Sequence, residues 1–264
     1  MPDAPYRPPA LLLGSLALHA AGALALAAAP RHWKAVAGTL FANHVVLAAA
    51  SLWPRSALVG SNLLKLPTSG RREVSLTFDD GPAPEVTPRV LDLLDRSGAR
   101  ATFFLIGRRA AVYPEIAAEI VRRGHRVENH THTHPHLFAC YPAPLLRREI
   151  ERAQEAIEAA AGQRPRLFRA PAGLRNPLLD LVLHQAGLRL VSWTRRGFDA
   201  FEQDPAAITR RLLRGLAPRD ILLLHDGRAT TGHGGNRIVL DVLPRVLDAL
   251  AERDLRSVPV EAPA

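Results

Sequence analysis

Two adjacent carboxylates, Asp79 and Asp80, lie in the segment TFDDGP (residues 77–82), at the point where an apolar run ends. Asp-Gly followed by Pro is ordinary turn chemistry, so a simple turn is one interpretation of this segment. Two neighbouring ionised acids repel each other, however, and holding them together is costly unless a cation or a cationic side chain binds one of them. A bound metal ion would separate them, and the segment therefore indicates a candidate metal site.

Four of the 11 histidines stand in the segment NHTHTHPH (residues 129–136), after a predicted strand around Val127. His130 and His134 are four positions apart, and on a helical turn this spacing places both imidazoles on one face. A solvated polar loop, or a tract that binds metal adventitiously, is the alternative interpretation. Together with Asp80, the pair would give three protein ligands and leave positions open for water, as in a catalytic metal site.

Two further segments place chemically active side chains directly after apolar residues. Arg169 begins the segment RAPAG (residues 169–173), where its guanidinium could pair with a carboxylate at a neighbouring strand end. His225 follows the apolar run ILLL (residues 221–224) and precedes Asp226. A histidine at a strand end beside an acid is a candidate general acid–base, and a structural histidine is the alternative.

The elements that must position these residues alternate between strands and helices from residue 72 onward, which predicts α/β architecture. Apolar runs predict buried parallel strands at Val74–Phe78, Thr102–Ile106, Leu167–Phe168, Leu188–Trp193 and Ile221–Leu224. Helical spacing predicts helices at Thr87–Ser97, Ala110–Arg123, Leu145–Ala161, Asn176–Gln185, Ala206–Leu216 and Ile238–Arg253. A barrel and a doubly wound sheet both satisfy this pattern, and both place chemistry at the carboxyl ends of the strands.

The first 53 residues differ in kind from the rest of the chain. Residues 10–29 contain no formally charged side chain, and twenty residues at helical rise match the thickness of a bilayer core. A second apolar run, residues 35–53, contains Asn43 and His44 and is flanked by Trp33 and Trp53, as interfacial anchors would flank a span. We therefore expect a membrane-associated segment over residues 1–53, as a hairpin of two helices.

Two alternatives to this hairpin remain open. The first run could be a cleavable signal, because Arg7 precedes it and residues 27–29 supply a small-residue cleavage site. The second run could be a buried or surface-lying helix, because its polar pair costs insertion energy. Arg31 and Lys34 favour a cytoplasmic loop between the runs, whereas the basic residues that follow the second run favour the opposite topology.

Composition excludes several classes of protein. The 264 residues are 47% hydrophobic and 22% charged, which excludes a disordered chain and a polytopic membrane protein. Cys140 is the only cysteine, so an internal disulfide and a multi-cysteine metal site are both excluded. The net charge of +9 comes from arginines spread along the chain. We expect no nucleic-acid partner, and we expect attraction to an anionic lipid or glycan instead.

Five ordered motifs, taken together, resemble one known family. TFDDGP, HTHTH, RAPAG, the spacing from Trp193 to Asp199, and LLLHD occur in the order found in NodB-type polysaccharide deacetylases, carbohydrate esterase family 4. The resemblance extends from Arg72 to about Val258. It implies a distorted parallel (β/α) barrel of about seven units, and it implies metal-dependent removal of an acyl group from the nitrogen of an amino sugar. We expect a membrane-associated segment at 1–53, a linker at 54–71 and a catalytic domain at 72–264.

The resemblance also implies a role for each matching residue. The family's metal ligands match Asp80, His130 and His134. Asp79 matches the catalytic base, and Arg169 matches the arginine that orients it. His225 matches the general acid, and Asp199 matches the aspartate that tunes this acid. For substrate binding, Leu223 matches the leucine that lines the acyl pocket, and Trp193 is a further candidate. The backbone N–H of Ala172 lies at the position where the family has the donor to the oxyanion.

The sequence departs from the family pattern around the sugar site. An aromatic residue is common where this chain has Ala172, and an Asp-Trp pair is usual where Asp199 is followed by Ala200. The walls that face the sugar are therefore expected to be thinner. Arg195 and Arg196 also come close to the site, where they would meet a phosphate or carboxylate of the substrate or belong to a solvated loop.

We therefore predict a membrane-anchored amidohydrolase that removes an acetyl or formyl group from an amino sugar in a cell-envelope glycan or a lipid-linked saccharide. The expected cofactor is one divalent metal ion, with zinc first and cobalt, nickel or iron as alternatives. The expected location is the cytoplasmic membrane, with the catalytic domain on its extracytoplasmic side. A non-catalytic glycan-binding or scaffold protein on the same fold, and a deacylase of a non-sugar amide, are the alternative functions.

Overall fold

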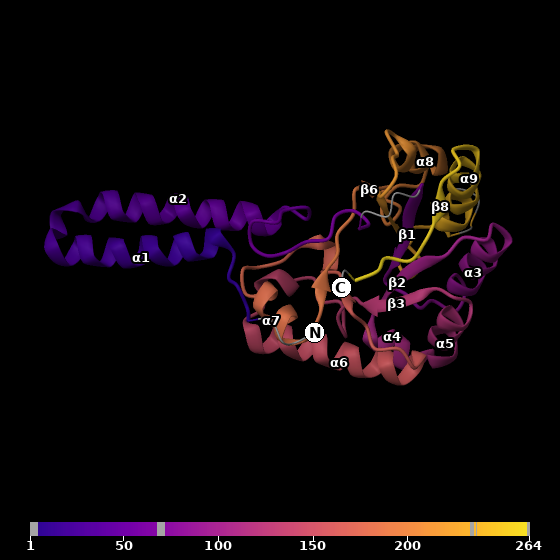
Figure 1. Cartoon of the computed structure of the whole chain (residues 1–264), viewed down its shortest axis with the longest axis horizontal. Coiled ribbons are helices and arrows are strands. Elements are labelled where there is room, and N and C mark those ends of the chain that lie inside the picture. The colour runs from indigo at the N-terminus through magenta and orange to yellow at the C-terminus, as the bar shows by residue number, and fades with distance from the viewer. Residues whose placement is uncertain (1–4, 68–71, 233–234, 236, 263–264) are drawn as a thin grey trace.

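The computed structural model of the chain describes residues 5–67, 72–232, 235 and 237–262. It consists of a long antiparallel helical hairpin and an α/β domain from which this hairpin projects (Figure 1). The hairpin is formed by α1 (Ala10–Ala28), the short turn η1 (Pro30–His32) and α2 (Trp33–Leu52). The α/β domain follows from β1 onward.

The sheet of the α/β domain is a parallel half-barrel. Its strands pair in the order β5-β4-β3-β2-β1-β7-β6, and β8 pairs with the start of β1. Every pair of named strands is parallel. The expected barrel of about seven units is thereby confirmed. The strands are β1 Glu73–Asp79, β2 Ala101–Leu105, β3 Arg126–Asn129, β4 Leu167–Phe168, β5 Arg189–Leu190, β6 Arg195–Arg196, β7 Ile221–His225 and β8 Arg256–Ser257.

Helices connect most successive strands, with β5 and β6 as an exception, and cover the outside of the sheet (Figure 1). Parallel neighbours need such crossovers, because a tight turn can join only antiparallel strands. Two short 3₁₀ turns, η2 (Phe138–Cys140) and η3 (Pro171–Gly173), lie in the loops. The helices of the α/β domain are α3 Thr87–Arg96, α4 Gly107–Val112, α5 Pro114–Arg122, α6 Ala143–Ala161, α7 Leu179–Gln185, α8 Pro205–Leu213 and α9 Ile238–Glu252.

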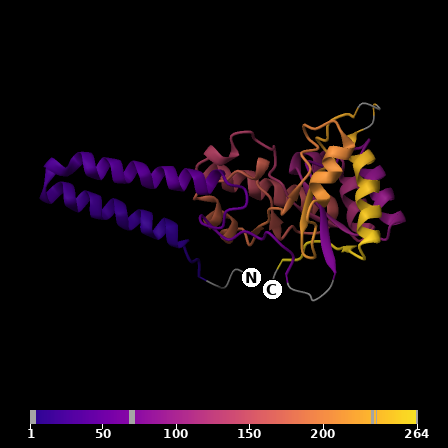
Figure 2. The ribbon, with the colours of Figure 1, turned by 90° about the horizontal axis from the view of Figure 1, so that it is seen from above.

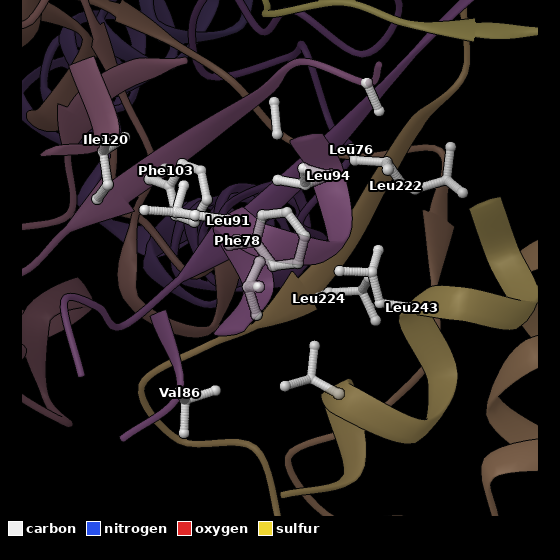
Figure 3. Close-up of a cluster of buried hydrophobic side chains, with 14 of the residues drawn as sticks. Leu76, Phe78, Val86, Leu91, Leu94, Phe103, Ile120, Leu222, Leu224 and Leu243 are labelled. Atoms are coloured by element: carbon white, nitrogen blue, oxygen red, sulfur yellow. The ribbon is translucent and has the colours of Figure 1, made fainter. Parts of the chain in front are cut away.

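The main core lies between the sheet and its outer helices. Phe78 of β1 stacks on Phe103 of β2 with ring centroids 5.0 Å apart. Figure 3 shows Leu76 and Phe78 beside Leu222 and Leu224 of β7, facing helical side chains such as Leu243. Because successive side chains of a strand point to opposite faces, the residues between these positions face the inside of the half-barrel.

Two predicted elements differ from the structure, and two strands were not predicted. The expected helix Ala110–Arg123 is divided between α4 and α5, because Pro114 occupies the first position of a new helix, where its missing N–H is not needed. The expected strand Leu188–Trp193 is reduced to the short β5. The strands β6 and β8 were not predicted, because two residues are too few to show a period. The other predicted elements are present with small shifts at their ends.

The hairpin exposes apolar side chains along its length. Leu24 of α1 and Phe41 of α2 are each 72% exposed. The helices contact each other partly through polar groups, since Asn43 Nδ2 donates to Ser15 Oγ at 2.8 Å. By length and composition, both helices could cross a membrane, and the first could equally belong to a signal sequence. An exposed apolar surface of this size needs a covering partner or a lipid phase.

Both ends of the hairpin attach to the α/β domain. Before α1, the Tyr6 ring lies 5.3 Å from the His184 ring of α7. After α2, the carbonyl of Pro54 accepts a hydrogen bond from Ser192 Oγ at 2.7 Å, and Leu63 forms a parallel bridge with Val191. Figure 2 shows the hairpin leaving one side of the domain. Residues 54–67, the described part of the expected linker, therefore pack on the barrel.

Candidate active site

The candidate site residues face the inside of the half-barrel because of strand alternation. Asp79 of β1 lies two positions after Thr77, and His225 of β7 lies two positions after Leu223. The register pairs Thr77 with Leu223 and Asp79 with His225. The two polar residues therefore stand side by side at the carboxyl ends of neighbouring strands, on the face opposite to the core of Phe78.

Arg169 is fully buried beneath this pair and binds Asp79. Its Nη1 donates to Asp79 Oδ1 at 2.7 Å and to Thr77 Oγ1 at 2.8 Å. Its Nη2 donates to the carbonyl of Ser192 at 3.1 Å, and its guanidinium carbon lies 4.0 Å from the centroid of the Phe104 ring. The guanidinium therefore fixes the orientation of the Asp79 carboxylate and leaves Oδ2 as the oxygen that is not bound by Arg169.

Asp80, His130 and His134 converge with one ligand atom each, and these atoms all lie within 4.8 Å of one another. Asp80 Oδ1 is 3.1 Å from His134 Nε2 and 3.4 Å from His130 Nε2. This oxygen is buried and accepts no well-formed hydrogen bond from the described residues. A buried carboxylate oxygen of this kind needs a partner. One carboxylate and two imidazoles fit a divalent metal ion at this point.

The backbone around the cluster is arranged for this convergence. Asp80 adopts a left-handed conformation with φ 72°, and its Oδ1 lies near the Nε2 atoms of His130 and His134. The ring of His130 is fixed because Nδ1 lies 2.8 Å from the carbonyl of Arg169, where an Nδ1–H donates. Nε2 then faces Asp80, as in metal sites whose imidazole is held by a backbone acceptor.

The prediction of a helical turn between His130 and His134 is wrong. Thr131 and His134 have positive φ values of 64° and 56°, so the segment is an irregular loop. Hydrogen bonds from side chains to the backbone hold this loop, instead of the backbone hydrogen bonds of a helix. Asn129 Oδ1 accepts from the N–H of Thr131 at 2.9 Å, and Glu149 accepts from the N–H of Thr133 at 2.9 Å. The two imidazoles meet because the loop folds back on itself.

The charges of the cluster are strongly coupled. Burial opposes ionisation of Asp80, but its interactions with His130 and His134 outweigh this effect and lower its pKa. Burial also opposes protonation of His130, but the charges of Asp79 and Asp80 raise its pKa. Burial and the neighbouring His130 lower the pKa of His134 to about 4. The lowered pKa favours the ionised form of the buried Asp80 carboxylate, and such a group favours a bound positive charge, which a divalent cation supplies.

His225 is held by Asp199 on the other side of Asp79. Asp199 Oδ1 lies 2.9 Å from His225 Nδ1, and Oδ2 accepts from the backbone N–H of His225 at 2.7 Å. Burial alone would lower the pKa of His225, but the charge and hydrogen bond of Asp199 outweigh it and raise the pKa to about 9. The imidazole is therefore positively charged at neutral pH, with Nε2 free of Asp199.

The expected substrate-binding residues lie on the same inner face. Leu223 and Trp193 are both buried and belong to one apolar cluster. Ala172 is exposed in η3 with φ 55°, and among the described residues nothing accepts a hydrogen bond from its N–H. Beside it, a Cβ added to Gly173 would lie 2.5 Å from the Trp193 ring and 2.8 Å from Pro54. The hairpin connector therefore packs close to this edge of the site.

Sequence reasoning missed three supporting residues. Thr77 binds Arg169, Asn129 binds the histidine loop, and Arg109 Nη1 donates to the carbonyl of Asp80 at 2.9 Å. Thr77 and Asn129 are the first residues of the segments TFDDGP and NHTHTHPH, so their positions were a usable signal. Arg109 lies on α4, and nothing in its local sequence indicates that it reaches the Asp80 turn.

Comparison with known proteins identifies the family. A family model described as polysaccharide deacetylase matches residues 67–191. A chitooligosaccharide deacetylase of Bradyrhizobium sp. (strain ANU 289) is 42% identical over 160 residues, which cover 60% of this chain and 73% of that protein. The chain belongs to the polysaccharide deacetylases. Membership in carbohydrate esterase family 4, which the ordered motifs predicted, is thereby confirmed.

Two other relatives agree with this assignment to the deacetylases. A peptidoglycan-N-acetylglucosamine deacetylase of Bacillus cereus is 33% identical over 190 residues, covering 71% of this chain and 66% of that protein. The structure of a family 4 carbohydrate esterase from Streptomyces lividans, in complex with acetate, superposes with a TM-score of 0.64 and 35% identity. It covers 71% of this chain and 92% of the other. The hairpin stands outside the matched family model.

Replacing Asp199 by asparagine should lower the pKa of His225 in this deacetylase. The Asp199→Asn change keeps the size of the side chain but removes the charge that raises the pKa to about 9, so the pKa should move toward the usual value of about 6.5. NMR titration of histidine-labelled protein measures this shift. Asp248→Asn, on the exposed surface of α9, is the matched control. An unchanged titration of His225 in Asp199→Asn would contradict this electrostatic account.

Proposed function

We propose that the chain is a metal-dependent N-deacylase of amino sugars and that the converging residues form its catalytic centre. The observation that supports this most strongly is the pairing of Asp79 with His225 in the register of β1 and β7, beside the Asp80, His130 and His134 cluster. Amide hydrolysis needs a base for water and an acid for the departing amine. Two groups with different hydrogen-bond partners, Arg169 for Asp79 and Asp199 for His225, meet this need at adjacent strand ends.

Asp80, His130 and His134 would hold one divalent ion, with zinc as the first choice. When bound, such an ion supplies a Lewis acid that polarises the amide carbonyl and lowers the pKa of water. Three protein ligands leave room for substrate and water, which is the arrangement of a catalytic site rather than a structural one.

The chain's own residues divide the proton transfers between them. Asp79, held through Oδ1 by Arg169, accepts the proton of the attacking water at its other oxygen. The backbone N–H of Ala172 donates to the oxyanion that forms at the former carbonyl. His225, kept protonated by Asp199, gives its proton to the nitrogen as the C–N bond breaks, so the products are a free amine and an acid. Leu223 and Trp193 would bound the space for the acyl group.

We propose an amino sugar of a cell-envelope glycan or a lipid-linked saccharide as the substrate. The relatives support this class, since their names refer to chitooligosaccharide and to peptidoglycan N-acetylglucosamine. Residues 1–53 would anchor the protein in the cytoplasmic membrane, residues 54–71 would form the connector, and residues 72–264 would form the catalytic domain outside the cytoplasm. Arg31 and Lys34 at the tip of the hairpin favour a tip on the cytoplasmic side, and the basic residues that follow α2 oppose it, so the proposed orientation is decided by experiment.

Acetate or formate release from a panel of amino sugars tests the reaction. The panel contains chitooligosaccharides, peptidoglycan fragments, a lipid-linked saccharide and a non-sugar N-acetyl amide. We expect release from at least one sugar, complete loss after chelation, and recovery when a divalent ion is added back. Release that persists in the chelated protein would contradict the metal site, and release from the non-sugar amide alone would contradict the substrate class.

Asp79→Asn should leave a folded protein that still binds metal but is nearly inactive. The variant keeps the shape of the side chain and removes the proton acceptor, so kcat/KM should fall by about a hundredfold or more. Elemental analysis of the purified protein reports the bound metal. Asp204→Asn is the control, because asparagine preserves the capping that Asp204 gives α8. Wild-type activity in Asp79→Asn would remove this residue from the mechanism.

Membrane anchoring and orientation can be measured with the single, exposed Cys140. We expect the full chain to resist extraction by alkaline carbonate. We also expect the first apolar run to remain uncleaved, so that the protein retains residue 1. In spheroplasts, a maleimide that does not cross membranes should label Cys140, and Cys140→Ser should remove the label. Extraction into the soluble fraction would contradict anchoring, and labelling only after lysis would contradict the extracytoplasmic location.

A further inference from the structure

Arg196 lies at the edge of the site and is not used by the reaction described above. It belongs to β6, where the register places it beside Leu223 of β7. Its guanidinium carbon is 5.2 Å from the centroid of the Trp193 ring and 4.8 Å from that of Phe198. Arg196 therefore stands next to two of the side chains proposed to face the acyl group, with its guanidinium held over aromatic rings.

The neighbouring arginine has a structural role that Arg196 lacks. Arg195 Nε donates to Asp220 at 2.9 Å, and Nη1 donates to the carbonyl of Arg214 at 2.5 Å. The side chain of Arg196, in contrast, makes no hydrogen bond or ion pair with any residue that the structure describes, and its Nε is buried without an acceptor. A half-buried guanidinium without a partner costs free energy in the free protein.

The two carboxylates whose charges act on Arg196 already bind other side chains. Burial lowers the pKa of Arg196, and the charges of Asp79 and Asp199 act against this effect. Asp79 is bound through Oδ1 by Arg169, however, and both oxygens of Asp199 are bound by His225. The guanidinium therefore faces these two carboxylates without forming an ion pair with them.

The backbone after Arg196 is strained in a way that keeps Phe198 close to the guanidinium. Phe198 has φ 65°, a conformation that a large aromatic residue rarely adopts. Gly197 is held against α8, since an added Cβ would lie 2.5 Å from Ile208 Cγ2. Strain of this kind persists only where the surrounding structure enforces it. The loop thus fixes the position of a charged group that has no internal partner among the described residues.

We propose that Arg196 binds an oxyanion of the substrate, a carboxylate or a phosphate ester carried on the acylated sugar or on the sugar next to it. The proposal rests on the deacylase function and specifies its substrate class. A planar guanidinium with a free edge binds both oxyanions in the same bidentate way. Its cation–π contacts with Trp193 and Phe198 reduce the conformational entropy that such binding would cost. Arg196 is then a specificity-determining residue.

Matched pairs of substrates test this proposal and distinguish the two oxyanions. One pair compares an N-acetylglucosaminyl-glucuronic acid disaccharide with the corresponding glucose disaccharide. The other compares N-acetylglucosamine 1-phosphate with N-acetylglucosamine. We expect the metal-loaded wild-type protein to prefer one anionic member over its neutral partner by about tenfold or more in kcat/KM. The preference should decrease as ionic strength rises.

Arg196→Gln should remove this preference, mainly by raising KM for the anionic substrate. Arg196→Lys should retain part of it, because an ammonium keeps the charge and loses the bidentate geometry. Arg89→Gln, which removes an exposed arginine of α3, is the control for net charge and should keep the preference. A purely structural role for Arg196 would instead lower kcat/KM equally for both members of a pair, and this result would overturn the proposal.

The outcomes separate this inference from the proposed function. Equal hydrolysis of neutral and anionic substrates by the wild-type protein overturns the role of Arg196 and leaves the deacylase reaction standing. No acid release from any substrate of the panel overturns the deacylase reaction and, with it, this inference. A preference that survives in Arg196→Gln assigns the oxyanion to another residue and also overturns the proposal.

Discussion

The buried contact between Arg169 and Asp79 is the interaction on which the rest of the site depends. A guanidinium with no exposed surface must have acceptors around it, and the interior of the half-barrel supplies Asp79, Thr77 and the carbonyl of Ser192. The carbonyl of Arg169 in turn orients His130. One residue thus fixes both the carboxylate proposed as the base and an imidazole proposed as a metal ligand.

The positions of the candidate site residues could be predicted because they follow apolar strands. In a parallel sheet the carboxyl ends of the strands meet at one edge, so residues distant in sequence, such as Asp79 and His225, become neighbours. Strand alternation also separates Leu223 from Leu222, which places one at the site and the other in the outer core. The order of elements followed from the apolar runs and the helical spacing, and the family followed from the five ordered motifs.

Other features depend on contacts that local sequence does not contain. The loop from His130 to His134 is not helical, because Glu149 of the following helix binds its backbone. The strand that contains Arg196 is two residues long and exists through its pairing with β7, so it has no period to detect. The packing of residues 54–67 on the barrel likewise comes from long-range bonds, such as that between Pro54 and Ser192.

The attachment of the hairpin at both of its ends has a mechanical consequence. A domain joined to its anchor by one flexible tether can swivel and sample a wide volume. Here Tyr6 on one side and Pro54 on the other attach the barrel to the hairpin at both of its ends, which restricts swivelling of the barrel. For a barrel seated on lipid in this way, the opening of the site would stay at one height and tilt above the bilayer. Sugars would then have to arrive at that height, by sideways diffusion of their own lipid carriers or within the first glycan layer.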